Sequence, residues 1–150
     1  MIVVQYNKKQ KEEVMTKSNL AYFKAAKAIS EMSDHQQYKV GAVVVMNHRI
    51  ISSGHNSDSK THPLQKKYNR YRFTDEGDHK QHAELAALLP LIHKRVDLSN
   101  AIIFTYRAYK NERIAMSRPC PSCMQLIKDL GIKRICYTTE DGYAYERISY

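Results

Sequence analysis

The stretches that determine the fold of this chain are His82-Ala83-Glu84 and Pro119-Cys120-Pro121-Ser122-Cys123. Together they offer one imidazole and two thiols as metal ligands, with a carboxylate two residues from the imidazole. Imidazole and thiolate are ligands that zinc prefers, and a site with three protein ligands keeps its fourth coordination position open for water or substrate. An open position is typical of a catalytic zinc. The sequence therefore predicts a catalytic centre with His82, Cys120 and Cys123 as zinc ligands.

Glu84 has the position expected of a proton carrier beside this metal. Two residues apart on a helix means a rotation of about 200°, so Glu84 does not easily share the metal with His82. Bound zinc lowers the pKa of its water from about 15.7 to about 7, which makes a nucleophile available at neutral pH. A carboxyl group nearby can act first as general base and then as general acid. We therefore predict Glu84 as the catalytic residue of a hydrolytic reaction.

Hydrophobic periodicity predicts that helices alternate with strands along the chain. Helices are expected over residues 16–33, 80–89 and 121–131, and strands over 38–46, 49–53, 101–106, 133–138 and 143–148. The apolar face expected for the first helix consists of Tyr22, Ala25, Ala26, Ile29 and Met32. Pro90 is expected to kink or end the second helix, and Asn47-His48 to form a tight turn. This order predicts an α/β fold in which helices pack on a mixed sheet.

Composition is typical of a soluble globular protein, and the basic charge would attract anions. The 150 residues include 24 Lys and Arg against 15 Asp and Glu, a net charge of +9 that favours nucleotides, RNA or DNA. The alternative is a solvated surface that happens to be basic. No apolar run approaches the ~20 residues of a membrane span, and Ile2-Val3-Val4 is too short for a signal peptide. We expect one cytoplasmic domain over residues 1–150.

The cysteines favour metal chemistry over disulfides. Three cysteines with a C-x-x-C spacing do not suggest a disulfide framework. The third one, Cys136, lies in a buried strand pattern and is expected to be a small core residue.

The first of two polar segments, 55–80, is expected to be a functional loop because it is long and lacks clear periodicity, and the second, 107–118, is expected to be a polar loop. The second contains four basic residues, Arg107, Lys110, Arg113 and Arg118. Arginine can hold a phosphate through two N–H groups, which would favour a nucleotide substrate over a nucleoside. The alternative is that these side chains are only solvated.

An H-x-E motif followed by P-C-x-x-C is the signature of zinc-dependent nucleobase deaminases, and the chain resembles the cytidine and deoxycytidylate deaminase superfamily. The resemblance covers about residues 16–140 and includes three further segments, Val40-Gly41-Ala42-Val43-Val44-Val45, Gly54-His55-Asn56 and Gly131-Ile132-Lys133-Arg134-Ile135. It implies a three-layer α-β-α sandwich with a mixed five-stranded sheet, as in cytidine deaminases. It also implies one catalytic Zn²⁺ per chain and a homo-oligomeric assembly.

The resemblance further implies how substrate is held. Asn56 would hold the sugar or the base edge, and the backbone N–H of Ala83 would bind the base carbonyl. His62, in the loop expected to border the pocket, is another candidate substrate-binding residue. His62 and His79 with Asp78 could instead form a second, structural zinc site, although isolated histidines in polar loops are seldom ligands.

Three functions remain open from the sequence. The first is hydrolytic deamination of a cytosine nucleotide or nucleoside, with dCMP as the first candidate. The second is a deaminase that acts on bases in RNA or single-stranded DNA, including adenosine, which the net charge favours. The third is a non-catalytic, deaminase-like binding module, against which the intact Glu84 argues.

Overall fold

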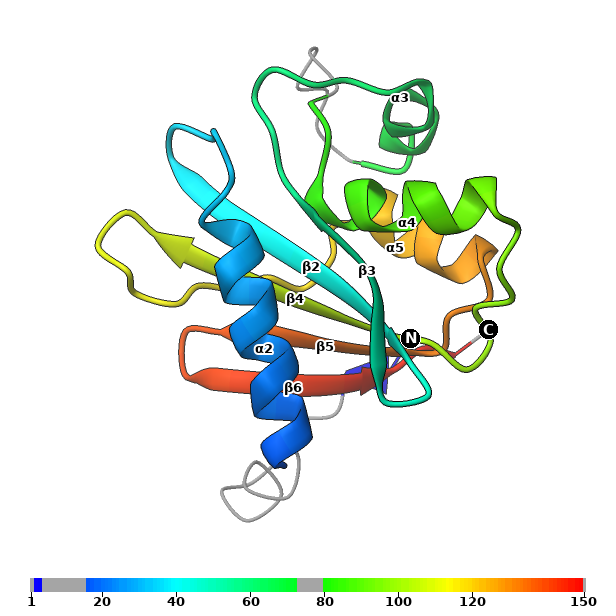
Figure 1. Cartoon of the computed structure of the whole chain (residues 1–150). Helices are drawn as coiled ribbons and strands as arrows, with labels where there is room; N and C mark the ends of the chain where they lie inside the picture. The colour runs from blue at the N-terminus through cyan, green and yellow to red at the C-terminus, as the bar shows by residue number, and fades with distance from the viewer. Residues whose placement is uncertain (1, 4–15, 73–79, 150) are drawn as a thin grey trace.

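The computed structural model describes residues 2–3, 16–72 and 80–149 (Figure 1). In chain order its elements are β1 (Ile2–Val3), α2 (Lys17–Ser30), β2 (Tyr38–Met46), β3 (Arg49–His55), α3 (Pro63–Asn69), α4 (Ala83–His93), β4 (Ile102–Tyr109), α5 (Pro121–Asp129), β5 (Arg134–Thr139) and β6 (Gly142–Arg147). No helix in these ranges has the length and apolar character needed to cross a bilayer.

A single mixed sheet connects the strands in the order β1-β6-β5-β4-β2-β3. β4 and β5 are parallel, and the other neighbouring pairs are antiparallel. The strands β2 to β6 each have six residues or more, whereas β1 has two. The predicted five-stranded mixed sheet is therefore confirmed, and β1 extends it at the β6 edge.

Helices cover both faces of the sheet, which confirms the three-layer sandwich (Figure 1). Because successive strand residues point to opposite faces, Val44 packs in the core beneath α4, while Val43 and Val45 pack beneath α2. This double burial explains the unbroken β-branched run in β2. Cys136 is buried on the α2 side, as expected of a core residue.

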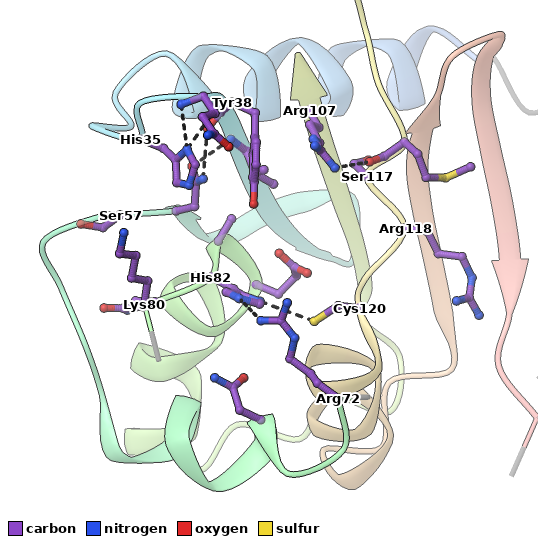
Figure 2. A pocket seen from close by; sticks show the side chains of 18 residues that line it. His35, Tyr38, Ser57, Arg72, Lys80, His82, Arg107, Ser117, Arg118 and Cys120 are labelled. Carbon is purple, nitrogen blue, oxygen red and sulfur yellow. Dashed lines mark hydrogen bonds between the residues drawn. The ribbon is translucent and has the colours of Figure 1, made fainter. Parts of the chain in front are cut away.

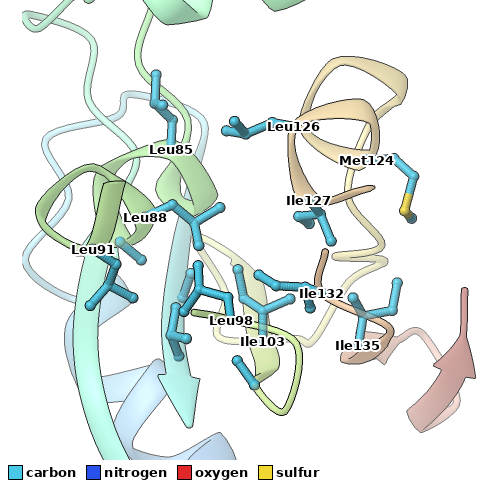
Figure 3. Packing of buried hydrophobic residues seen from close by; sticks show 14 of the residues in the cluster. Leu85, Leu88, Leu91, Leu98, Ile103, Met124, Leu126, Ile127, Ile132 and Ile135 are labelled. Carbon is cyan, nitrogen blue, oxygen red and sulfur yellow. The ribbon is translucent and has the colours of Figure 1, made fainter. Parts of the chain in front are cut away.

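The larger core joins α4 to α5 and positions both helices over the sheet (Figure 3). Its labelled members come from α4, α5 and the segments beneath them: Leu85, Leu88, Leu91, Leu98, Ile103, Met124, Leu126, Ile127, Ile132 and Ile135. A short helix, α3, packs against α5 on the same side.

Two glycines allow the helices to approach the sheet closely. A Cβ atom at Gly41 would lie 2.1 Å from the carbonyl oxygen of Ala26 in α2, and one at Gly54 would lie 2.4 Å from the backbone nitrogen of Ala87 in α4. Real Cβ atoms do not come this close to backbone, so both positions require glycine. The position of α4 against β3 is therefore fixed by close contact between main-chain atoms.

Some element boundaries predicted from the sequence are wrong. The helix α4 contains Pro90 and continues to His93, because Leu91 beyond the proline is buried in the core and holds the last turn in place. The segment 55–80 includes α3, which begins with the cap His62 and with Pro63 in its first turn, a favourable start for a helix. The turn at Asn47-His48 is confirmed, since both residues have positive φ.

The predicted apolar face of α2 and the predicted end of β4 also differ from the structure. Met32 lies beyond the end of α2 and is 66% exposed, whereas Phe23 provides the buried aromatic ring of that helix. The strand β4 extends to Tyr109, which pairs with Tyr38 at the start of β2. The predicted loop 107–118 therefore begins inside a strand, and its first residue, Arg107, belongs to the sheet.

Candidate metal centre and substrate cavity

Two helices begin at the predicted metal ligands. His82 is the N-cap residue of α4, Cys120 is the N-cap residue of α5, and Cys123 lies in the first turn of α5. An N-cap side chain usually accepts a hydrogen bond from its own helix, but neither His82 nor Cys120 does so. Their side chains turn toward each other instead, and the two helix N-termini meet as the sequence predicts (Figure 2).

The three ligand atoms form a compact group. Nδ1 of His82 lies 3.5 Å from Sγ of Cys120 and 3.3 Å from Sγ of Cys123, and all three atoms lie within 4.8 Å of one another. A tetrahedral zinc, at about 2.3 Å from sulfur and about 2.0 Å from nitrogen, separates these ligands by about 3.5 Å. The donor set therefore fits zinc in chemical type and in spacing. Across the described ranges, no fourth histidine, cysteine or acidic residue joins the group.

The two thiols are electrostatically distinct. The hydrogen bond from Cys123, together with the neighbouring His82, lowers the pKa of Cys120 to about 3. The same shared hydrogen bond and burial raise the pKa of Cys123 well above its ordinary value. Cys120 is therefore the thiol that ionises more readily, and Cys123 is the one that keeps its proton to higher pH. Because thiolates are the zinc ligands, metal binding releases that proton.

His82 is held in an environment rich in negative charge. Burial alone would lower the pKa of His82, but its hydrogen bond with Cys120 and the charges of Cys120 and Glu84 raise it overall. The outer ring nitrogen, Nε2, lies 3.4 Å from Nη1 of Arg72, which extends toward the ring in Figure 2. The ring therefore presents Nδ1 to both sulfur atoms and Nε2 to the arginine.

Glu84 is buried in the first turn of α4, beside the ligand group. Burial disfavours the ionised carboxylate and raises the pKa of Glu84 above its ordinary value, although the charge of His82 acts in the opposite direction. A carboxyl group with a raised pKa can hold and release a proton closer to neutral pH, which is what general acid–base catalysis requires.

A cavity of about 490 Å³ opens next to the ligands (Figure 2). This volume lies within the usual range for small-molecule sites. His82, Ala83, Glu84 and Cys120 line the part of the cavity beside the metal ligands. Four cationic side chains also line it: Arg72, Lys80, Arg107 and Arg118. The cavity therefore combines a metal centre with a positively charged wall.

The predicted substrate-binding residues differ in their placement. Asn56 lines the cavity, where its Oδ1 accepts hydrogen bonds from Ser33 Oγ at 2.6 Å and from the Val40 backbone N–H at 2.9 Å. Ala83 also lines the cavity, and as the first residue of α4 its N–H has no acceptor within the helix.

His62 does not line the cavity. Its Nδ1 accepts a hydrogen bond from the Leu64 backbone N–H at 3.1 Å and so caps α3. Its suggested partners in a second zinc site, Asp78 and His79, lie outside the described residues, so that prediction stays untested.

An aromatic and cationic stack forms one wall of the cavity, and sequence reasoning missed it. The rings of His35 and Tyr38 are stacked with centroids 4.2 Å apart, and the Arg107 guanidinium lies 4.0 Å from the centre of the Tyr38 ring. The strand pairing explains this contact, because Tyr38 faces Tyr109 across the sheet and Arg107 lies two residues before Tyr109. The alternation of side chains in β4 was the signal that could have revealed it.

The segment that leads to the cysteines is tied to the sheet. Ser117 Oγ donates to the carbonyl oxygen of Thr105 at 3.0 Å and accepts from the Thr138 backbone N–H at 2.8 Å. Arg118 then donates from Nε and Nη2 to the two carboxylate oxygens of Glu146, at 2.8 and 3.0 Å. These bonds fix the chain immediately before Pro119 and Cys120.

The model of the family described as the cytidine and deoxycytidylate deaminase zinc-binding region matches residues 15–139. The chain belongs to this family. It is therefore a zinc-dependent deaminase, and zinc is the cofactor that its His/Cys/Cys group could hold. No curated protein sequence matches this deaminase.

Solved structures with the same fold agree with this assignment. A dCMP deaminase from the cyanophage S-TIM5, in complex with dCMP and dUMP, is 25% identical with a TM-score of 0.57, and the match covers 90% of this chain and 85% of that chain. A cytidine deaminase from Burkholderia pseudomallei is 20% identical with a TM-score of 0.61, and the match covers 89% of this chain and 93% of that chain.

Proposed function

We propose that this deaminase converts the cytosine of a 5′-mononucleotide to uracil, with dCMP as its substrate. The observation that carries the proposal is Arg107, which lines the cavity, stacks on the Tyr38 ring and forms no ion pair with a carboxylate among the described residues. A guanidinium that lines a cavity without a carboxylate partner can bind a phosphate through charged hydrogen bonds. The similar cyanophage enzyme, a dCMP deaminase with dCMP and dUMP in its structure, supports the same substrate.

The chemistry follows from the placement of Glu84. His82, Cys120 and Cys123 would hold the zinc, which would supply a water acidic enough to attack the ring at neutral pH. The Glu84 carboxylate accepts one proton of this water and passes it to the adjacent ring nitrogen. It then transfers the second proton to the amino group, which leaves as ammonia. The oxygen of the water becomes the new carbonyl, so cytosine and water give uracil and ammonia.

Main-chain and side-chain groups orient the base. The Ala83 N–H donates to the base carbonyl from the N-terminus of α4, where the helix dipole makes it a stronger donor. Asn56 is held rigidly by Ser33 and Val40 and forms the wall against which the sugar or base edge lies. These contacts place the amino-bearing carbon beside Glu84.

Arg107 is better prepared to bind the phosphate than Lys80 or Arg118. Lys80 is paired with Asp58 at 3.3 Å, and Arg118 is held by Glu146. The guanidinium of Arg107 instead rests on the Tyr38 ring, with Nη1 at 3.4 Å from the carbonyl oxygen of Met116. Stacking keeps the guanidinium plane fixed, so its N–H groups can meet a phosphate in the two-bond geometry that arginine favours.

The test is a substrate panel on zinc-loaded protein, with ammonia release as the readout. The substrates are dCMP, deoxycytidine, CMP, cytidine and a cytosine-containing single-stranded oligonucleotide. We expect dCMP to give the highest kcat/KM. Arg107→Met should lower kcat/KM for dCMP by about 10- to 150-fold, the equivalent of about 1.5–3 kcal/mol of charged hydrogen bonds, and should leave deoxycytidine unchanged. Arg113→Met, on the same segment but outside the cavity, is the matched control.

Each part of the proposal can fail separately. If no cytosine substrate releases ammonia, the assigned reaction is wrong. If Arg107→Met lowers kcat/KM equally for dCMP and deoxycytidine, Arg107 does not bind the phosphate. Preferred turnover of the oligonucleotide, weakening steeply as salt increases, would replace the mononucleotide by a polynucleotide substrate.

A further inference from the structure

We propose that α3 is a brace that sets the position of the ligand His82 relative to the two cysteines, with Gln65 as the positioning residue. The inference concerns the metal centre and does not depend on which base the enzyme deaminates. In Figure 1, α3 lies beside α4 and α5, the two helices that begin at the metal ligands.

Gln65 is the direct link between α3 and the metal ligand. Its side chain is only 2% exposed, and its Oε1 accepts the backbone N–H of His82 at 3.0 Å. Its Nε2 donates to Oδ1 of Asn69, one turn later in α3, at 2.8 Å. Because the oxygen and the nitrogen of the amide are both engaged, the Gln65 side chain has one orientation. The main chain at His82 is therefore held from outside its own helix.

This support matters because of where His82 lies. An N-cap side chain normally anchors the start of its helix, but the His82 ring is turned toward the sulfur atoms and makes no capping bond. The start of α4 therefore needs another anchor if Nδ1 is to stay at the right distance from the cysteines. The Gln65 carbonyl provides that anchor at the ligand residue itself.

The helix α3 is also tied to the helix that carries the cysteines. The Tyr68 hydroxyl donates to Oδ2 of Asp129, the last residue of α5, at 2.7 Å. Arg72, just after α3, places Nη1 at 3.4 Å from Nε2 of His82. The segment from Gln65 to Arg72 thus contacts the main chain and the ring of one ligand, and the helix of the other two.

Partners that orient a metal ligand typically change metal affinity by about 10- to 100-fold when they are removed. The test compares Gln65→Met, which keeps the length of the side chain but neither hydrogen bond, with Gln65→Glu, which keeps the acceptor for the His82 N–H. Gln125→Met is the matched control, since Gln125 likewise donates to a side chain four residues later in its helix, that of Asp129, but does not touch a ligand.

Two readouts are independent of turnover. The first is zinc affinity, measured by competition with a chromophoric chelator. The second is the visible spectrum of the Co²⁺-loaded protein, which reports the geometry of the ligand set. Circular dichroism shows whether each variant is folded.

We expect Gln65→Met to bind zinc about 10- to 100-fold more weakly and to alter the cobalt spectrum, and Gln65→Glu to remain within about threefold of the wild type. The zinc affinity of Gln125→Met should stay within about twofold of the wild-type value. A folded Gln65→Met with wild-type zinc affinity and spectrum overturns the proposal. If Gln65→Met does not fold, the result for Gln65→Glu tests the proposal by itself. A loss of zinc affinity of about tenfold or more in Gln65→Glu, which retains the acceptor, also overturns the proposal. No substrate is present, so failure of the proposed reaction would not change these results.

Discussion

Removing Arg118 should destabilise the fold strongly, because it leaves a buried carboxylate without its counter-ion. The Glu146 side chain is 0% exposed, and the Arg118 side chain is 25% exposed. Two short hydrogen bonds join them, and the Tyr137 hydroxyl donates a third to the same carboxylate at 3.2 Å. Arg118→Met keeps most of the aliphatic stem and removes only the guanidinium.

The expected loss can be worked out from this burial. Removing one partner of a buried ion pair costs about 3–5 kcal/mol. Arg118 reaches solvent and Tyr137 still donates in the variant, so we expect the lower end, about 3 kcal/mol. For a chain of this size, this corresponds to a fall in Tm of about 6–12 °C. In the double variant Arg118→Met/Glu146→Met no charge is left buried, and the remaining loss should be only about 1–2 kcal/mol, mainly for the unpaired Tyr137 hydroxyl.

The assay is urea unfolding of the zinc-saturated proteins. Arg134→Met is the control, because Arg134 donates only to the Asn100 carbonyl at an exposed site, and it should change stability by about 0.5 kcal/mol or less. Two results would refute the reasoning. One is a loss below about 1 kcal/mol in Arg118→Met, and the other is a double variant no more stable than this single one.

Three further predictions test the packing of α4 on β3, the proton-transfer role of Glu84 and the contact of α3 with α5. Gly54→Ala would place a methyl group 2.4 Å from the Ala87 nitrogen, so thermal unfolding should show a loss of about 1–3 kcal/mol; an unchanged Tm would mean that α4 can shift. Glu84→Gln should lower kcat by about 10²- to 10⁴-fold while zinc stays bound in elemental analysis; lost zinc or wild-type turnover would contradict its role. Tyr68→Phe removes the hydrogen bond that holds the pKa of Asp129 below its ordinary value of 3.8. Because Asp129 is exposed and screened, the cost should be at most about 1 kcal/mol. The loss of stability in Tyr68→Phe should be fully present above pH 3.8 and should disappear as the pH falls through the lowered pKa of Asp129. A difference in urea midpoint between wild type and variant that grows toward acid pH would contradict this.

Much of the fold could be predicted because its signals are local. The β-branched run at 43–45 indicates a strand buried on both faces, and the turn at Asn47-His48 needs only the tolerance of asparagine for positive φ. The ligand motifs each open a helix, so their meeting follows once both helices pack on one face of the sheet. These features depend on neighbours in sequence or on the small number of ways in which helices and strands pack in α/β folds.

The fine structure of the cavity wall depends on distant partners and could not be predicted in this way. Arg107 and Arg118 look alike in the sequence, yet one rests on Tyr38 and the other is held by Glu146, 28 positions away. The prediction that His62 binds substrate depends on the expectation that its loop borders the pocket. The proline that follows His62 is a local signal for the start of a helix, and it agrees with the position of His62 as the cap of α3.

The burial of Cys136 has a practical consequence for studying the metal centre. This thiol lies on the α2 side of the sheet, and burial raises its pKa to about 12, so it should be silent toward thiol-modifying reagents near neutral pH. Half-buried Cys120, with its low pKa, should react first. A colorimetric thiol titration of the folded enzyme would therefore report metal occupancy directly, without a cysteine having to be engineered away.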